Sequence, residues 1–430
     1  MARKKLFSDI LSVLGSNAFA VVNALVISII LTRTLGPEGF GLYAAILVVP
    51  MGVIALTQLG IRASAIYHIG KDRDNLQSTV STIMMVLGLT SLAGMLIAAV
   101  VLLLMDTVDY TFPMMVLVVL FVPVHLTTLY AGGIFLGKEE IRKANFIRWF
   151  PVFVDVLLVL LFVLFFKWRI TGALLAIFAA YLIAALWALV ILSREHSIVP
   201  RFNKDIAGRL VKMGIVFALS VFVIQLNYRI DVLILKSLTS AEEVGFYALG
   251  VSIAESLWQL PLAVGIVVMS RTANTKDHRL MNQTTARLLR LSLLAGLAGA
   301  ILLFAGAPWL IPWIWGKAFM PSIDLLRYIL PGILFLSVFR IISSRLSGMG
   351  KPQIAIYVFL PSLALNVALN YWWIPGYGTM GAVMATNVSY VLGAIAFLIV
   401  YARVVDMPLK EIVCFRNSDF EYRVGGRKNR

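Results

Sequence analysis

Long apolar runs alternate with short polar stretches along almost the whole chain of 430 residues. Twelve runs are each long enough for a helix that crosses a bilayer, which needs about 20 mostly apolar residues. They cover residues 9–31, 40–61, 77–104, 113–136, 147–166, 171–192, 213–236, 245–269, 288–315, 325–347, 353–374 and 379–403. Because hydrocarbon cannot hydrogen-bond a free backbone, spanning segments are helices or closed barrels, and these runs are too long for strands. The pattern therefore predicts an all-α integral membrane protein with twelve transmembrane helices.

Composition and charge placement support the same conclusion. The chain is 60% apolar and only 13% charged, whereas a soluble domain carries about 25% charged residues. If the N-terminus is cytoplasmic, 29 of the 37 Lys and Arg residues lie in the N-terminus, the cytoplasmic loops and the C-terminal tail, and six lie on the opposite side. This positive-inside pattern predicts that both termini are cytoplasmic. It attributes the net charge of +16 to topology and to contact with anionic membrane lipids, rather than to nucleic acid.

Three pairs of short stretches are alike and keep their order along the chain. They pair 39–45 with 243–249, 137–141 with 350–354, and 171–176 with 380–385. The offsets of 204, 213 and 209 residues are close to half the chain, which predicts a duplicated unit of six spans. Because six is even, the repeats enter the membrane in the same direction and are related by an axis along the membrane normal. We therefore expect two parallel six-helix repeats around a central cavity.

The same pattern predicts how the chain is divided. The expected parts are an N-terminal bundle (1–195), a cytoplasmic linker (196–212), a C-terminal bundle (213–403) and a basic cytoplasmic tail (404–430). Residues 408–415 of the tail are expected on the membrane surface, and the remainder is expected to be disordered. The only cysteine, Cys414, lies in this tail, so neither a disulfide nor a thiolate metal site is possible within the chain.

Enzyme and nucleotide motifs are nearly absent. The stretch 132–138 resembles a phosphate-binding loop, but Glu139 stands where a Ser or Thr would hold magnesium. Gly133 and Gly137 are instead expected to allow close helix packing. The predicted external loops are short, which disfavours a membrane oligosaccharide polymerase or ligase. We predict no catalytic residues, no metal site and no cofactor other than a coupling ion.

The informative residues are the ionisable ones inside predicted spans, because each costs on the order of 3 kcal/mol at mid-membrane unless it faces protein or water. They are Asp155, Arg229, Asp231, Glu255 and Arg340. Amide side chains accompany them at a spacing of four, which places each pair on one helix face. These pairs are Gln225 with Arg229, Asn227 with Asp231, Gln259 with Glu255, and Asn366 with Asn370. We interpret the set as the polar lining of a cavity.

Two interpretations of these charges remain open. In the functional one, Arg229 and Arg340 bind an anionic headgroup, because a guanidinium presents a fork that fits phosphate. Asp155, Asp231 or Glu255 then binds a coupling H⁺ or Na⁺. In the structural one, the charges only pair with each other and hold the helices together.

Two motifs carry a resemblance to a known family. Residues 31–43 read Leu-Thr-Arg-Thr-Leu-Gly-Pro-Glu-Gly-Phe-Gly-Leu-Tyr, and the second motif joins 228–235 to Glu-Val-Gly-Phe-Tyr at 243–247. The chain resembles the polysaccharide and O-antigen flippases of the multidrug/oligosaccharidyl-lipid/polysaccharide exporter superfamily. The resemblance implies a bacterial plasma (inner) membrane protein that moves an undecaprenyl-diphosphate-linked oligosaccharide by ion-coupled alternating access. It also implies polysaccharide polymerases and glycosyltransferases as partners.

Two relatives of that family are alternatives. A drug/cation antiporter also has twelve spans, but its cavity should be mainly acidic, whereas both signs occur here. A lipid II flippase typically has two further spans. Within the repeated Gly-x-Tyr motif, we expect Gly41 and Gly245 to allow tight packing, and the rings of Tyr43 and Tyr247 to anchor at the membrane interface.

Overall fold

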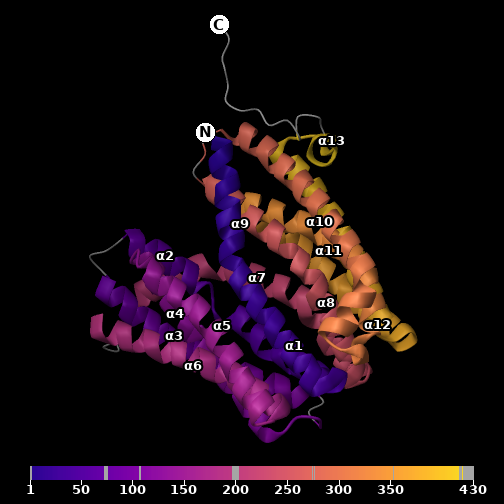
Figure 1. The fold of residues 1–430 in the computed structure, drawn as a ribbon. Helices are drawn as coiled ribbons and strands as arrows, with labels where there is room; N and C mark the ends of the chain where they lie inside the picture. Colours follow the sequence, from indigo (N-terminus) through magenta and orange to yellow (C-terminus); the bar gives the residue numbers. More distant parts are fainter. Residues whose placement is uncertain are drawn as a thin grey trace.

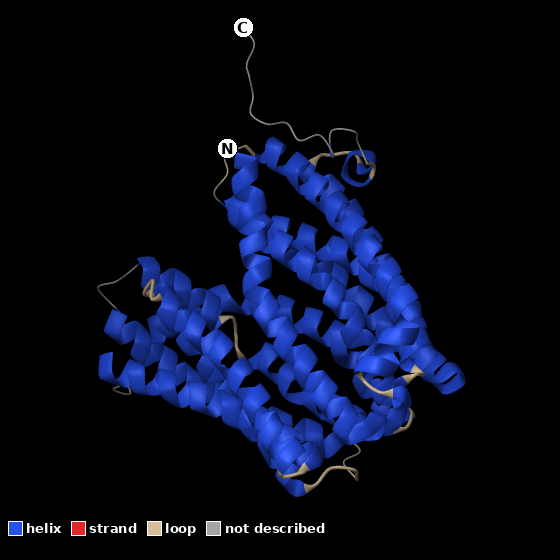
Figure 2. Cartoon of the chain, viewed as in Figure 1, coloured by secondary structure: helices blue, strands red, loops and turns tan. Residues whose placement is uncertain are grey.

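The computed structural model describes residues 2–71, 76–105, 108–195, 203–273, 275, 277–351, 353–415 and 419. Every regular element within these residues is helical (Figure 2). The α-helices are α1 (Ala2–Thr57), α2 (Ile61–Lys71), α3 (Leu76–Leu104), α4 (Phe112–Gly137), α5 (Ile141–Val159), α6 (Arg169–Glu195), α7 (Lys204–Leu238), α8 (Ala241–Glu255), α9 (Gln259–Ala273), α10 (His278–Ile314), α11 (Ser322–Gly348), α12 (Gln353–Val405) and α13 (Leu409–Val413). Shorter helices of other types are η1 (Leu160–Phe165), η2 (Ser256–Trp258) and η3 (Lys317–Phe319).

The described residues contain ten apolar helical stretches long enough to cross a membrane. Two of these stretches, of 50 and 53 residues, are long enough to cross it twice. Val21–Gly70 contains the non-helical Gly36, and Gln353–Val405 contains the non-helical Gly378. A straight helix of 53 residues, the length of α12, would measure about 80 Å, far more than the roughly 30 Å of bilayer hydrocarbon. Each of these two stretches therefore folds back at its glycine, which makes twelve crossings and confirms the predicted fold class.

The helices form two groups that meet along α1 and α7 (Figure 1). In the first repeat, α4 packs against α2, α3, α5 and α6, and in the second, α11 packs against α8, α9, α10 and α12. Helix α1 begins, and α12 ends, at the same end of the molecule, which we call the termini side. The opposite end, the far side, carries the turns at Gly36 and Gly378. The predicted domain bounds stay a prediction, and linker residues 196–202 lie outside the described residues.

Equivalent turns of the two repeats share unusual backbone angles. Glu139 and Gly350 both have positive φ, 64° and 76°, in the turns that follow α4 and α11. Arg169 and Gly378 are 209 residues apart and have φ of 48° and 55°. Positive φ is uncommon for residues other than glycine, so its recurrence at matching turns indicates the same local design. The duplication inferred from the sequence thus extends to the backbone.

The repeats approach each other closely at the paired glycines of the Gly-x-Tyr motif. A Cβ atom added at Gly41 would lie 1.9 Å from the carbonyl oxygen of Ala241. One added at Gly245 would lie 2.0 Å from the carbonyl oxygen of Pro37. Both pairs of equivalent residues are 204 apart, so the contact is reciprocal, as expected where a pseudo-two-fold axis passes between the helices. The predicted tight packing at these glycines is confirmed.

The interface position predicted for the two tyrosines is wrong. Tyr43 is only 9% exposed and Tyr247 is fully buried. Each tyrosine follows its glycine by two residues, which is about 200° around a helix, so it points away from the contact between repeats. That direction leads into the repeat's own packed interior rather than to the membrane surface.

Two smaller packing features complete the fold. A Cβ at Gly133 would lie 2.9 Å from the backbone oxygen of Arg62, and one at Gly137 would lie 2.8 Å from Ile69, which confirms that these glycines let α4 approach α2. In the tail, α13 packs on α10 and α12, and Ile412 is fully buried. Residues 416–418 and 420–430, where disorder is predicted, lie outside the described residues.

Candidate substrate and ion sites

The structure joins two of the predicted residues in an ion pair inside the membrane-spanning region. Arg229 lies in the second half of α7, and Glu255 is the last residue of α8. The Arg229 Nη2 atom is 2.9 Å from Glu255 Oε2, and the two side chains are 40% and 15% exposed. Arg229 therefore keeps part of its guanidinium open beside its carboxylate partner.

Arg340 comes from α11 and is held by aromatic rings instead. Its guanidinium carbon lies 4.4 Å from the ring centre of Trp258 and 5.3 Å from that of Tyr228. These rings are 5.0 Å apart, and the Trp258 indole donates a 3.3 Å hydrogen bond to the Ile333 carbonyl. Such cation–π contacts stabilise a cation without neutralising it.

The two arginines are therefore neighbours across one aromatic side chain, because Tyr228 precedes Arg229 and contacts Arg340. We call this group the arginine cluster. It consists of Tyr228, Arg229, Glu255, Trp258 and Arg340. Among the described residues no ion pair is formed by Arg340, and its Nε atom is buried without a hydrogen-bond partner. The cluster carries two positive charges and one negative charge.

A pocket of about 180 Å³ adjoins the cluster between α1, α3 and α7. Two polar side chains, Gln225 and Arg229, line it from α7. The other described residues that line it are Val48, Val49, Met51, Gly52, Val53, Leu56, Ile97, Val101, Phe222, Leu226 and Leu233. The pocket is thus apolar, with one guanidinium at its wall, and it lies between the two repeats.

Asp231 belongs to a different site, although it is only two residues from Arg229. It is 2% exposed and accepts hydrogen bonds from the Tyr247 hydroxyl and, at 3.2 Å, from Thr386 Oγ1. Its other oxygen accepts from the backbone N–H of Val232 at 3.1 Å. Two residues turn a helix by about 200°, so Asp231 faces α8 and α12 while Arg229 faces the pocket.

A layer of buried amides continues from Asp231 between α7 and α12. Asn366 donates to Ser389 Oγ at 3.2 Å, and Asn370 donates to Asn366 Oδ1 at 3.0 Å. The Ser389 hydroxyl in turn donates to the Thr386 carbonyl at 3.0 Å. Asn227, Asn366 and Asn370 are fully buried. Both amide atoms of Asn227 and the Oδ1 of Asn370 have no hydrogen-bond partner, which is rare for buried polar atoms.

Two predicted residues do not join either group. Asp155 lies in α5 of the first repeat, 6% exposed, with its Oδ1 buried and without a partner. Gln259 was expected on one straight face with Glu255, but η2 intervenes between them. A 3₁₀ turn has about 3.0 residues per turn rather than 3.6, so the two side chains are not directly aligned. The sequence pattern cannot show this tightening.

Sequence reasoning missed Tyr228, Trp258 and Thr386, and it assigned Tyr247 to the membrane interface instead of to the Asp231 site. Tyr228 and Trp258 form the aromatic support of Arg340, and Tyr247 and Thr386 bind Asp231. The one available signal was that Tyr228 directly precedes an arginine within a span. The other contacts join helices far apart in the sequence, and no local spacing indicates them.

Comparisons with known structures show which fold the chain shares. The fold is similar to that of an inward-facing multidrug-resistance MATE transporter of the MOP superfamily, with a TM-score of 0.73, 17% identity, and coverage of 90% of this chain and 94% of that one. It is also similar to a MOP superfamily transporter from Pyrococcus furiosus, with a TM-score of 0.67, 15% identity, and coverage of 93% and 95%.

Sequence comparisons identify the family and the superfamily. A model of the polysaccharide biosynthesis protein family matches residues 6–269, and the MatE model matches 217–372. The chain belongs to the polysaccharide biosynthesis protein family. With the MatE match, it is a multi-pass membrane transporter of the MOP superfamily. A proposed O-antigen transporter of Shigella flexneri is 24% identical over 389 residues, which cover 87% of this chain and 92% of that protein. An uncharacterized membrane protein of Methanocaldococcus jannaschii is 22% identical over 416 residues, covering 91% and 98%.

Proposed function

We propose that this protein is a flippase that moves an undecaprenyl-diphosphate-linked oligosaccharide across the bacterial plasma membrane for surface polysaccharide biosynthesis. The observation that carries the proposal is the arginine cluster, where Arg340 has no carboxylate partner among the described residues. A charge at mid-membrane is costly unless it faces water or a counter-charge. A diphosphate supplies that counter-charge, and guanidinium groups bind it with paired hydrogen bonds.

The positions of the two arginines suit a substrate that moves between the membrane faces. Arg340 lies in the half of α11 nearer the termini side, and Arg229 lies in the half of α7 nearer the far side. With the termini side cytoplasmic, as the positive-inside pattern predicts, a headgroup that enters from the cytoplasm meets Arg340 first. It then reaches Arg229, where its charge replaces that of Glu255. The ion pair thus holds Arg229 ready between transport cycles.

Coupling to an ion is the second part of the proposal. Of the three predicted carboxylates, Asp231 is the one that accepts hydrogen bonds from two hydroxyl groups, those of Tyr247 and Thr386. Asn366 and Asn370 lie in the same helix as Thr386. Oxygen ligands suit hard cations such as Na⁺, and the unpartnered Asn370 Oδ1 fits a ligand role. The same carboxylate can instead carry H⁺. Asp155 is a further candidate, in the first repeat, and Glu255 acts through Arg229.

A drug/cation antiporter is the competing function, and the similarity to MATE structures favours it. The net positive charge of the arginine cluster opposes it, because a cationic drug would be repelled there. The family model that covers most of the chain also describes polysaccharide biosynthesis proteins. Since one matched relative, the proposed O-antigen transporter, and the solved neighbours are transporters, we further propose that the protein is not an enzyme.

The test replaces each arginine in a bacterial strain that lacks the chromosomal gene. We expect Arg229→Ala and Arg340→Ala each to reduce flipping roughly tenfold or more, because a hydrogen-bonded charge contributes about 1.5–3 kcal/mol. Lipid-linked oligosaccharide should accumulate on the cytoplasmic leaflet, and surface polysaccharide should fall. Arg327→Ala is the matched control, because Arg327 lies in the same helix as Arg340 but contacts Phe304 instead. Normal surface polysaccharide together with drug hypersensitivity would identify an antiporter and refute the flippase.

A further inference from the structure

Two cations at the far side reach from one repeat to the other. Arg33 lies in α1, near the far-side end of its first crossing, and its Nε atom donates a 2.8 Å hydrogen bond to the Ile314 carbonyl of α10. Its Nη2 atom donates to the neighbouring Trp313 carbonyl. In the other direction, Lys236 near the end of α7 pairs with Asp109, in the turn between α3 and α4. Both contacts therefore join helices of different repeats.

The two contacts are equivalent under the duplication. Arg33 and Lys236 are 203 residues apart, and Asp109 and Ile314 are 205 apart, close to the 204 that separates the paired glycines. In each repeat, a cation at the end of the first crossing thus contacts the end of the third crossing of the other repeat, or the turn directly after it. Contacts that recur about a pseudo-two-fold axis depend on how the two halves are placed, and not on one pair of helices. We call them the Arg33 latch and the Lys236 latch.

The Arg33 latch supplies a helix cap from the opposite repeat. The last four carbonyl groups of an α-helix have no intrahelical donor, and a cation is favourable beside them because it faces the negative end of the helix dipole. Trp313 and Ile314 are the last two residues of α10. Next to them, the Trp315 indole donates a 3.0 Å hydrogen bond to Ser28 Oγ of α1. Separation of the repeats therefore leaves these carbonyl groups and the indole to bind water instead.

The Lys236 latch is an ion pair that is buried on one side only. The Lys236 side chain is 8% exposed and that of Asp109 is 45% exposed. The ammonium group lies 6.0 Å from the ring centre of Tyr110, whose hydroxyl donates a 3.1 Å hydrogen bond to the Leu42 carbonyl. Leu42 directly follows one of the paired glycines, which connects this latch to the close contact between the repeats. Because the carboxylate is open to water, we expect the pair to be weaker than the Arg33 latch and to be screened by salt.

We propose that the Arg33 latch and the Lys236 latch together hold the far side of the transporter closed, and that both release when it opens there. A rotation of the repeats about the axis between them separates the two contacts at the same time, because each latch occupies the position that the axis assigns to the other. Neither latch contains a residue of the arginine cluster or of the Asp231 site. The proposal therefore concerns the motion of the repeats and goes beyond the identity of the substrate.

The chain offers a matched control for the removal of a charge. Lys317 is an exposed cation in η3, within the turn that follows α10, and it belongs to neither latch. Lys317→Ala therefore removes a positive charge near the Arg33 latch and leaves both latches in place. Asp109→Asn is a second variant of the Lys236 latch. It removes the charge of the partner at an exposed side chain of unchanged size, so we expect it to fold normally.

The experiment measures the distance between the two far-side turns in the full chain, held in phospholipid nanodiscs. Spin labels are attached at Phe112→Cys and Met320→Cys in a Cys414→Ser background. Phe112 and Met320 are 74% and 53% exposed, and they lie close in sequence to the Lys236 latch and the Arg33 latch, respectively. Pulsed electron paramagnetic resonance then gives the populations of molecules with a short, closed distance and with a long, open distance.

We expect Arg33→Ala to raise the ratio of open to closed molecules roughly tenfold, because a hydrogen-bonded charge contributes about that factor. Lys236→Ala and Asp109→Asn should each raise it about two- to fivefold, the range for an exposed pair, and both together should do no more than either alone. High salt should raise the ratio in wild type but add little once Lys236 is replaced. Lys317→Ala should leave the ratio unchanged.

Distances that stay the same in folded Arg33→Ala and Lys236→Ala protein would show that the contacts are fixed joints between the repeats, and would overturn the latch. An equal shift in Lys317→Ala would attribute the effect to net charge and overturn it as well. The measurement uses no substrate, so its result is independent of the flippase assignment. Conversely, surface polysaccharide that stays intact without the gene would refute the flippase assignment and leave the latch in place.

Discussion

At the residue scale, Gly41 and Gly245 show how one atom controls the approach of the repeats. The backbone of each glycine lies against a carbonyl of the other repeat, at distances that exclude a Cβ atom.

The two arginines show how neighbouring side chains decide whether a buried charge is neutralised. Arg229 is stabilised by a carboxylate and Arg340 by two aromatic rings, so only one of them is neutralised. Identical side chains inside a membrane thus acquire different roles from their neighbours.

We expect Gly41→Ala and Gly245→Ala to destabilise the protein. An alanine Cβ would lie within about 2 Å of a backbone oxygen, and such overpacking typically costs about 1–3 kcal/mol because the backbone must shift. Size-exclusion chromatography of heated, detergent-solubilised protein should show a lower melting temperature for both. Gly376→Ala is the control, because a Cβ there would meet nothing within 4 Å. Equal melting of all three variants would contradict the close contact.

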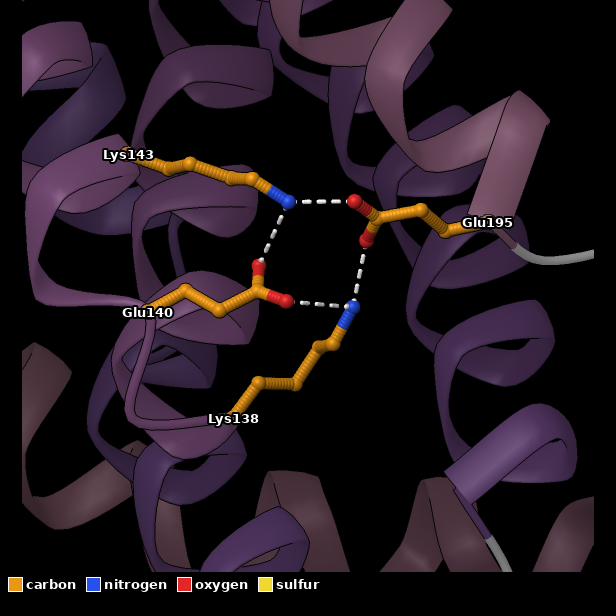
Figure 3. Close-up of polar contacts among 4 residues, drawn as sticks. All are labelled: Lys138, Glu140, Lys143 and Glu195. Carbon is orange, nitrogen blue, oxygen red and sulfur yellow. Dashed lines mark hydrogen bonds and ion pairs between the residues drawn. The ribbon is translucent and has the colours of Figure 1, made fainter.

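At the element scale, a square of four charged side chains ties the turn between α4 and α5 to the end of α6 (Figure 3). Lys138 and Lys143 each pair with both Glu140 and Glu195. These residues lie outside the predicted spans 147–166 and 171–192, at the termini side. Partial burial acts to raise the pKa of Glu195, but hydrogen bonds from Lys138 and Lys143 outweigh it and hold the pKa below its usual value. The square therefore helps to hold the first repeat together as a unit.

We expect Glu195→Gln to lower stability at pH 7 by up to about 1 kcal/mol, the usual range for exposed ion pairs. Because the folded pKa of Glu195 is depressed, its contribution is present above the unfolded pKa and is lost as the pH falls through the folded value. The difference in melting temperature between wild type and variant should therefore close below about pH 4.3. Glu38→Gln, at an exposed carboxylate, is the control. A difference that persists in acid would indicate a packing effect instead.

At the scale of the whole molecule, duplication and charge placement together set the orientation. Matching turns and the reciprocal glycine contact relate the two repeats by a pseudo-two-fold axis. Parallel repeats leave the first and last helices ending on one side, which the excess of Lys and Arg predicts to be cytoplasmic.

The orientation can be tested with the single cysteine. Cys414 is exposed and follows α13, beyond the last span. We expect a membrane-impermeant maleimide to label it in inverted membrane vesicles but not in intact spheroplasts. A Cys414→Ser variant controls for background labelling. Labelling in spheroplasts alone would reverse the predicted topology and, with it, the direction of transport.

Much of the fold could be predicted because its causes are local. The length of an apolar run indicates that it crosses the membrane, because each segment must hydrogen-bond its own backbone in hydrocarbon. The repeated Gly-x-Tyr motif and two repeated turns, at 137–141 with 350–354 and 171–176 with 380–385, indicate the duplication. The prediction placed Tyr43 and Tyr247 at the membrane interface, and this was wrong because ring direction depends on which face of the helix the other repeat covers.

The sites were predicted as a set of residues but not as an arrangement. An ionisable side chain in an apolar run is visible in the sequence, because its position alone marks it as costly to place in a membrane. Its partner is not visible, because Arg229 meets Glu255, and Asp231 meets Tyr247 and Thr386, across separate helices. The sequence alone determined the twelve spans, the two repeats and the polar residues within them. The packing of helices decided that Arg229 and Arg340 share one cluster and that Asp231 belongs to another, because contacts between distant segments exist only after the helices assemble.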